Sequence, residues 1–100
     1  MPALKVAFMA LVGGADPKLQ HAVLTVNDVE VKTVLVGSVD QAVSTAKQLA
    51  ADGYRFIELC GGFGHLGCAK VVEAVKGTAE VGVVRFDFHP AFGRSADDIG

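Results

Sequence analysis

The sequence contains no tryptophan, few aromatic residues and nearly balanced charges. Aromatic side chains make up 7% of the 100 residues, too few to form a stacking platform for single-stranded nucleic acid. The formal net charge is −2 and no basic run occurs, so we expect no nucleic-acid partner and no anionic membrane surface. The expected partners are therefore a small molecule and other copies of this chain.

Long apolar runs are also lacking, and we expect no secretion signal. The N-terminal stretch MPALKVAFMALVGG has no basic segment before its apolar run and is shorter than the ~20 apolar residues of a membrane span. We interpret it as a buried strand and expect no membrane partner. The two cysteines, Cys60 and Cys68, predict free thiols in a reducing, cytoplasmic setting.

Apolar residues, by contrast, are abundant. They make up 51% of the chain, and charged residues only 20%. Such an excess is typical of a parallel sheet covered on both faces, and also of a chain that buries surface in an oligomer. The length is that of one domain, so we expect a single domain over residues 1–100, with an irregular tail over 89–100, in a homo-oligomer that is most simply a dimer.

Strand and helix patterns alternate along the chain. Apolar, strand-forming segments occupy residues 4–12, 29–37, 54–60 and 80–88. Between them, Asp16 and Pro17 predict the start of a helix over 18–26, and Ser38 with Gln41 forms a capping box for a second helix. Gly53 and Gly77 are expected to end the second and third helices, and the third has apolar residues at Leu66, Ala69, Val72 and Val75.

This alternation predicts an α/β fold of βαβαβαβ organisation. We expect a four-stranded, mainly parallel sheet with helices on both faces and the flavodoxin-like strand order 2-1-3-4. A partial barrel that pairs with a copy of itself is the alternative. In open α/β sheets, ligands bind beyond the carboxyl ends of the strands, where the loops GGADP, GS, CGGFGH and DFHP would meet.

The glycine-rich loop has three interpretations. Residues 62–67 form a G-x-G-x-x-G pattern between a strand and a helix, and Asp87 lies 20 residues beyond Gly67, as in a dinucleotide fingerprint. Glu58, however, is charged where that motif expects an apolar residue. A tight turn and an anion site on the helix N-terminus are the other interpretations, and no cofactor is expected.

Ionisable residues flank this loop on two expected strands. Alternation places Glu58 and Cys60 on one face of 54–60, and Arg85, Asp87 and His89 on one face of 80–88. Glu58 and Arg85 could form a buried ion pair. Alternatively, Arg85 binds a substrate carboxylate or phosphate and Glu58 is a general base.

Two further pairs could perform chemistry. Cys60 at the start of the glycine turn could be a nucleophile with His65 as its base, although a small buried hydrophobe is the plainer role for Cys60. Asp87 and His89 could form an acid–base pair. With Cys60 and His65 they could also bind a metal, but no pair has the usual ligand spacing and no metal site is predicted.

The blocks IELCGGFG and VGVVRFDFHP resemble those of a group of small, mostly bacterial proteins catalogued as a domain of unknown function. The resemblance covers essentially the whole chain and implies a small α/β fold without an established activity. After His-Pro the group's tail is glycine-rich, whereas this chain has Ala91 and Phe92. The matching motif residues are Glu58, Cys60, Gly61, Gly62, Gly64, Arg85, Asp87 and His89.

These patterns favour a cofactor-independent enzyme that acts on a small anionic organic molecule by acid–base chemistry, as an isomerase, lyase or hydrolase. The expected catalytic residues are Glu58, Cys60, His65, Asp87 and His89. The expected ligand-binding residues are Gly13, Gly14, Gly61, Gly62, Gly64 and Arg85. A non-catalytic, homodimeric module for a phosphate or nucleotide is the second hypothesis, and a metal-dependent hydrolase is the third.

Overall fold

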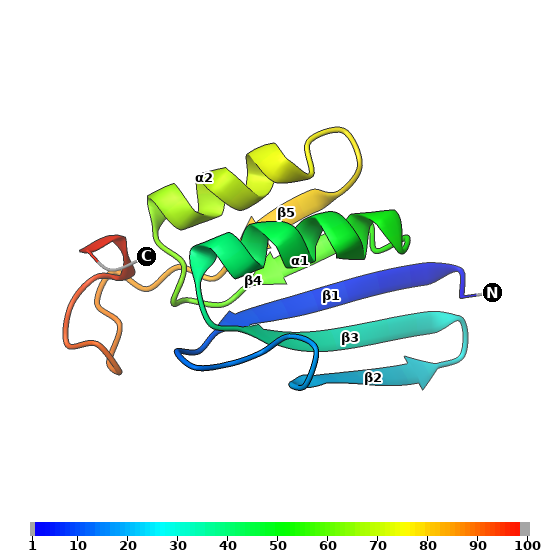
Figure 1. The fold of residues 1–100 in the computed structure, drawn as a ribbon, viewed down its shortest axis with the longest axis horizontal. Coiled ribbons are helices and arrows are strands. Elements are labelled where there is room, and N and C mark those ends of the chain that lie inside the picture. The colour runs from blue at the N-terminus through cyan, green and yellow to red at the C-terminus, as the bar shows by residue number, and fades with distance from the viewer. Residues whose placement is uncertain (1, 99–100) are drawn as a thin grey trace.

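The computed structural model describes residues 2–98 and has five strands, two α-helices and one short 3-10 helix (Figure 1). It is a mixed α/β domain built as one sheet with helices packed on it. No helix among these residues has the length and hydropathy needed to cross a bilayer. In chain order the elements are β1 (Leu4–Leu11), β2 (His21–Val26), β3 (Val29–Val36), α1 (Val39–Ala51), β4 (Phe56–Leu59), α2 (His65–Ala74), β5 (Glu80–Val83) and the 3-10 helix Ala96–Asp98.

The helix expected over 18–26 is wrong, because this segment forms strand β2. Asp16 and Pro17 begin only a single turn, in which the Asp16 carboxylate accepts the Lys18 N–H at 2.9 Å. β2 then pairs antiparallel with β3 through a two-residue turn, and Asn27 adopts a φ of 52° there. Tight hairpins require such a left-handed residue, and asparagine tolerates it.

The sheet has the order β2-β3-β1-β4-β5, so the predicted count of four strands is wrong, and the order differs from the prediction by the added edge strand β2. The four predicted strands lie as β3-β1-β4-β5, which corresponds to the predicted order 2-1-3-4. β1 lies between β3 and β4 and is parallel to both, and β5 is parallel to β4. Only β2, at one edge, runs antiparallel. β5 also ends at Val83, five residues before the predicted end of its strand, so the segment that follows is not paired as a strand.

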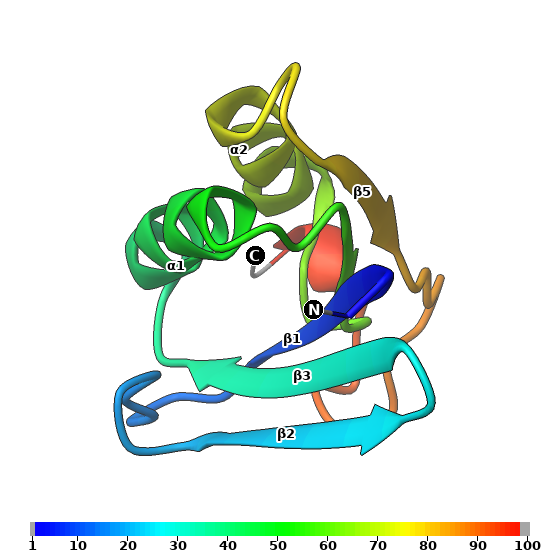
Figure 2. The same ribbon diagram turned by 90° about the vertical axis from the view of Figure 1, so that its right-hand side faces the viewer.

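Both helices lie on the same face of the sheet (Figure 2), so the expectation of helices on both faces is wrong. The chain passes from β3 to β4 and then to β5 in one direction across the sheet. Right-handed crossovers that progress in one direction place their helices on one side. A crossover helix between β1 and β3 would have lain on the opposite face, because that step runs in the other direction across the sheet. Strand β2 takes its place.

Helix α1 forms as its sequence predicts. The Ser38 side chain accepts the Gln41 N–H at 3.1 Å, which confirms the N-cap, and Gly53 follows the helix with a φ of 94°. Its inner face is buried against the sheet. Helix α2 departs from its prediction, because it buries Gly67 and Val71 and leaves Leu66 exposed.

The hydrophobic core lies between the helices and one face of the sheet. Its largest fully buried side chains are Met9, Leu49, Ile57, Leu59, Val34, Val36, Val71 and Val75. The opposite face of the sheet carries no helix within residues 2–98 (Figure 2). There the strands expose Phe8, Leu24 and Phe56 to solvent.

Candidate functional site

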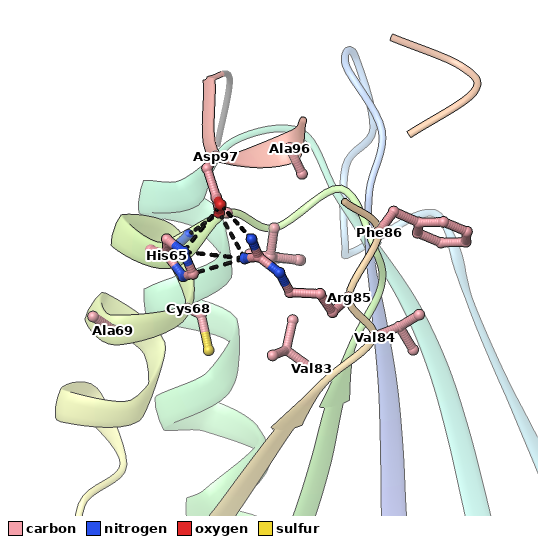
Figure 3. A pocket seen from close by; sticks show the side chains of 11 residues that line it. His65, Cys68, Ala69, Val83, Val84, Arg85, Phe86, Ala96 and Asp97 are labelled. Atoms are coloured by element: carbon pink, nitrogen blue, oxygen red, sulfur yellow. Dashed lines mark hydrogen bonds and ion pairs between the residues drawn. The ribbon is translucent and has the colours of Figure 1, made fainter. Parts of the chain in front are cut away.

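A pocket of about 320 Å³ lies between the start of α2 and the segment that follows β5 (Figure 3). Apolar and small side chains form its walls, and the polar side chains of His65, Arg85 and Asp97 converge at one end. The segment after β5 places Arg85 there, and the tail places Asp97 opposite it. The remaining lining residues are Phe63, Gly64, Cys68, Ala69, Val83, Val84, Phe86 and Ala96.

The Asp97 carboxylate is the centre of this polar end. Arg85 binds it at two points, with Nη2 2.8 Å from Oδ2 and Nη1 donating to Oδ1 at 3.2 Å. The backbone N–H of His65 donates to Oδ1 at 2.9 Å, and its ring Nε2 lies 3.0 Å from Oδ2. One carboxylate thus receives a guanidinium, an imidazole and a helix N-terminal amide.

This arrangement also completes the start of α2. Its N-cap residue is Gly64, which has no side chain to accept a hydrogen bond from the first turn. Asp97, 32 residues later in the chain, supplies the acceptor instead. An anion at this position is favoured by the free N–H groups and the dipole of the helix.

Electrostatics keep this carboxylate charged. The Arg85 guanidinium holds the pKa of Asp97 below its usual range, and the His65 backbone N–H contributes in the same direction. The hydrogen bond to Asp97 in turn raises the pKa of Arg85. Burial raises the pKa of the neighbouring Cys68 thiol. At neutral pH the pocket therefore contains a carboxylate–guanidinium pair beside a protonated thiol.

The glycine turn is a strand-to-helix connection, as the sequence predicts, but its first glycine is needed for packing. A Cβ on Gly61 would lie 2.2 Å from Cδ2 of Phe86, so only glycine allows the Phe86 ring to rest on this backbone. His89 lies beside the same glycine, and its ring stacks on Phe92 with centroids 4.4 Å apart. Gly62 also lies close to Phe92, so the tail covers this turn with aromatic rings.

Cys60 is not paired with His65 by any hydrogen bond found in residues 2–98. Its Sγ accepts the backbone N–H groups of Leu11 and Gly62, each at 3.3 Å. His65 instead faces Arg85 and Asp97. The proposed Cys60–His65 couple is therefore not assembled in this structure, because the turn directs the two side chains to different neighbours.

Glu58 lies on the open face of the sheet, where its side chain is exposed. Among the described residues it forms no ion pair, so the suggested Glu58–Arg85 pair is wrong. The reason is that β5 ends at Val83, and Arg85 turns toward α2 instead of lying beside β4. Glu58 and Cys60 both border a separate hollow of about 240 Å³, together with Phe8, Met9, Ala10, Thr33, Leu59 and Val84.

Asp87 and His89 are likewise not joined. The Asp87 side chain is 97% exposed and its Oδ1 lies 3.5 Å from Nε of Arg85. His89 accepts the Ala91 N–H on Nδ1 at 3.2 Å. No group of three His, Cys, Asp or Glu residues suited to a metal ion occurs within residues 2–98.

Of the predicted site residues, the pocket brings together Gly64, His65 and Arg85. Gly13 and Gly14 belong to the turn after β1 and do not line this pocket. Asp97 is not among the residues that the sequence predicts for the site. Its only local signal is a carboxylate in an otherwise irregular tail, and nothing in the pattern indicates a contact with a helix 32 residues earlier.

Comparison with known proteins places the chain in a family. It belongs to a family of unknown function, DUF6506, whose model matches residues 4–97. No curated protein and no solved structure gives a significant match. The match covers nearly all of the described domain and leaves the chemistry to be inferred from the site.

Proposed function

We propose that this protein binds a small anionic organic molecule in the pocket beside Arg85 and acts on it by acid–base chemistry without a cofactor. The observation that carries the proposal is the convergence of Arg85 and His65 on one carboxylate at one end of an apolar-walled pocket. A molecule with a carboxylate or phosphate at one end and a short apolar body matches these surroundings.

The carboxylate of Asp97 supports the choice of an anion. It takes up the donors that a ligand carboxylate would use: the Arg85 guanidinium and the first amide of α2. Guanidinium groups bind carboxylates and phosphates through two parallel hydrogen bonds. In the proposed complex the ligand shares Arg85 with Asp97 or displaces Asp97 from it.

His65 is the proposed acid–base residue. Its ring is 72% exposed at the pocket, and Nε2 lies 3.0 Å from the Asp97 carboxylate. A proton on Nε2 would be donated to that carboxylate, and Nδ1, which lies 3.4 Å from Nη1 of Arg85, would then be the accepting nitrogen, for the guanidinium or for a substrate proton. Proton transfer of this kind serves isomerisation, elimination and hydrolysis equally.

A thermal-shift screen with short mono- and dicarboxylates, phosphate and sugar phosphates tests the binding step. A ligand that binds the folded protein raises the midpoint of unfolding. We expect such ligands to stabilise the wild type and Arg94→Ala, which removes an exposed arginine outside the pocket. Arg85→Ala should lose the shift.

Retention of the shift in Arg85→Ala contradicts this site. An unfolded Arg85→Ala would show that the pair with Asp97 is mainly structural, and Arg85→Lys then provides the test because it keeps the charge but not the two-point geometry. For a ligand that binds, product formation followed by NMR tests the chemistry. His65→Gln should retain binding and lose turnover.

A non-catalytic binding module for a phosphate or nucleotide is the second candidate. It is supported by the separation of Glu58, Cys60 and His89 from the pocket. Of the predicted acid–base residues, only His65 then lines the pocket. In this case ligands shift the midpoint in an Arg85-dependent way and remain chemically unchanged. The free thiols of Cys60 and Cys68 agree with the cytoplasmic location proposed from the sequence.

A further inference from the structure

The open face of the sheet is apolar across four strands. Leu24 and Val26 are each 70% exposed, Phe56 is 47% exposed, Phe8 40% and Leu4 37%. The strand register places them on one face, because Leu24 lies opposite Val31, Val6 opposite Phe56, and Phe8 opposite Thr33. Partly buried neighbours on the same face are Val6, Ala10, Val29, Val31 and Leu35.

We propose that a second copy of this chain covers this face, so that two sheets pack against each other about a two-fold axis. The proposal does not depend on the pocket beside Arg85, which lies between α2 and the tail. Mainly parallel sheets are found with both faces covered, and here the helices cover only one (Figure 2). A second sheet supplies the missing layer at the usual spacing of about 10 Å.

The exposed area matches what a dimer requires. If a fully exposed side chain presents about 150–200 Å², the five exposed residues provide roughly 400–500 Å². The partly buried neighbours add to this. A standard interface buries about 800 Å² per partner, and about 65% of a homodimer interface is apolar, or roughly 500 Å². A single copy therefore offers as much apolar surface as one half of a stable dimer.

The distribution of charge favours a second copy and sets the approximate register. The residues that face this side from β2 are Ala22, Leu24 and Val26, without a charge or proline to protect the edge. The acidic residues on this face are Glu58 on β4 and Glu80 on β5, toward the edge of the sheet opposite to β2. A two-fold axis that passes near β3 places the uncharged strands of the two copies against each other. The four carboxylates, two from each copy, then lie at the rim of the interface.

Two variants of the same strand test this arrangement. Leu24→Glu places a charge on the open face, and Val23→Glu places one on the helix side, where Val23 is 48% exposed. By sedimentation velocity at tens of micromolar, we expect wild type and Val23→Glu to have twice the mass of the chain. Leu24→Glu should have the mass of one chain. Val26→Glu makes the same test on β2 if Leu24→Glu does not fold, because Val26 is also 70% exposed on the open face.

Side-chain footprinting with a carbene reagent tests the wild type directly. Leu19, Leu24 and Leu66 are 74%, 70% and 76% exposed in the single chain, so a monomer would label all three alike. The dimer should protect Leu24 and leave the other two labelled. A monomeric wild type, equal labelling of the three leucines, or dissociation by Val23→Glu but not by Leu24→Glu would each overturn the proposal. The last result would indicate contact through the other face.

Discussion

The two faces of the sheet are alike in composition and opposite in burial. Ile57 and Leu59 on β4 lie beneath the helices and are each 1% exposed. Phe56, the first residue of the same strand, lies on the other face and is 47% exposed. Apolar content alone therefore does not decide which face becomes the core of the chain. The direction of the crossovers decides it, because both helices are carried to the same side.

The largest expected effect comes from truncating one residue on each face. Leu59→Ala should lower the free energy of unfolding by about 2–5 kcal/mol, because it leaves a cavity in the core. Phe56→Ala should lower it by less than half as much at concentrations where the protein is monomeric. Urea unfolding at submicromolar concentration measures both. Equal losses would show that Phe56 is already covered within a single chain.

Gly61→Ala should have the next largest effect, a loss of about 1–3 kcal/mol from overpacking. The added methyl would lie 2.2 Å from the Phe86 ring, which must then leave the turn. Gly13→Ala is the matched control, because nothing lies within 4 Å of its added Cβ.

Removal of the ring identifies the cause of that loss. In a Phe86→Ala background, Gly61→Ala should be nearly neutral, and a double-mutant cycle by urea unfolding measures the difference. If Gly61→Ala is equally destabilising with and without the ring, the glycine is needed for its backbone and not for its contact with Phe86.

The smallest expected effect is the pH dependence of the contacts by which Asp97 attaches the tail to Arg85 and to the start of α2. Because the pKa of Asp97 is lowered in the folded protein, its stabilising contribution is present above the usual value of 3.8 and is lost as pH falls through the folded pKa. The stability difference between wild type and Asp97→Asn should therefore be constant near neutral pH and shrink below about pH 4. Urea unfolding between pH 7 and pH 3 measures it.

Asp87→Asn is the control for this pH dependence, since the Asp87 side chain is 97% exposed. It should differ little from wild type across the range. A difference between wild type and Asp97→Asn that persists unchanged in acid would mean that Asp97 contributes through packing and not through its charge.

Elements whose signals are local could be predicted from the sequence. The N-cap at Ser38 and the glycine after α1 act over a few residues, and both occur as expected. The segment 21–26 forms a strand although its apolar residues also fit helical spacing. Its β-branched residues, Val23, Thr25 and Val26, together with the two-residue turn that begins at Asn27, were the signals for a hairpin.

The candidate site was predicted only in part, for a different reason. His65 and Arg85 were selected for their chemistry, but their common partner Asp97 lies 32 and 12 residues away along the chain. The error at Glu58 came from assuming a sheet covered on both faces, in which an unpaired carboxylate would be costly. Once one face is open, Glu58 meets solvent and needs no partner.

The β2–β3 hairpin also has a consequence for how the chain folds. Within residues 2–98 it is the only strand pair closed by a tight turn, whereas Leu4 must find Val29 and Val6 must find Phe56. Short loops close faster than long ones, so we expect the hairpin to form first and the central strand β1 to be enclosed late. Until then Leu24 and Val26 lie on an uncovered ribbon. The same strand that is proposed to join two folded copies is therefore the segment where folding chains are most prone to aggregate.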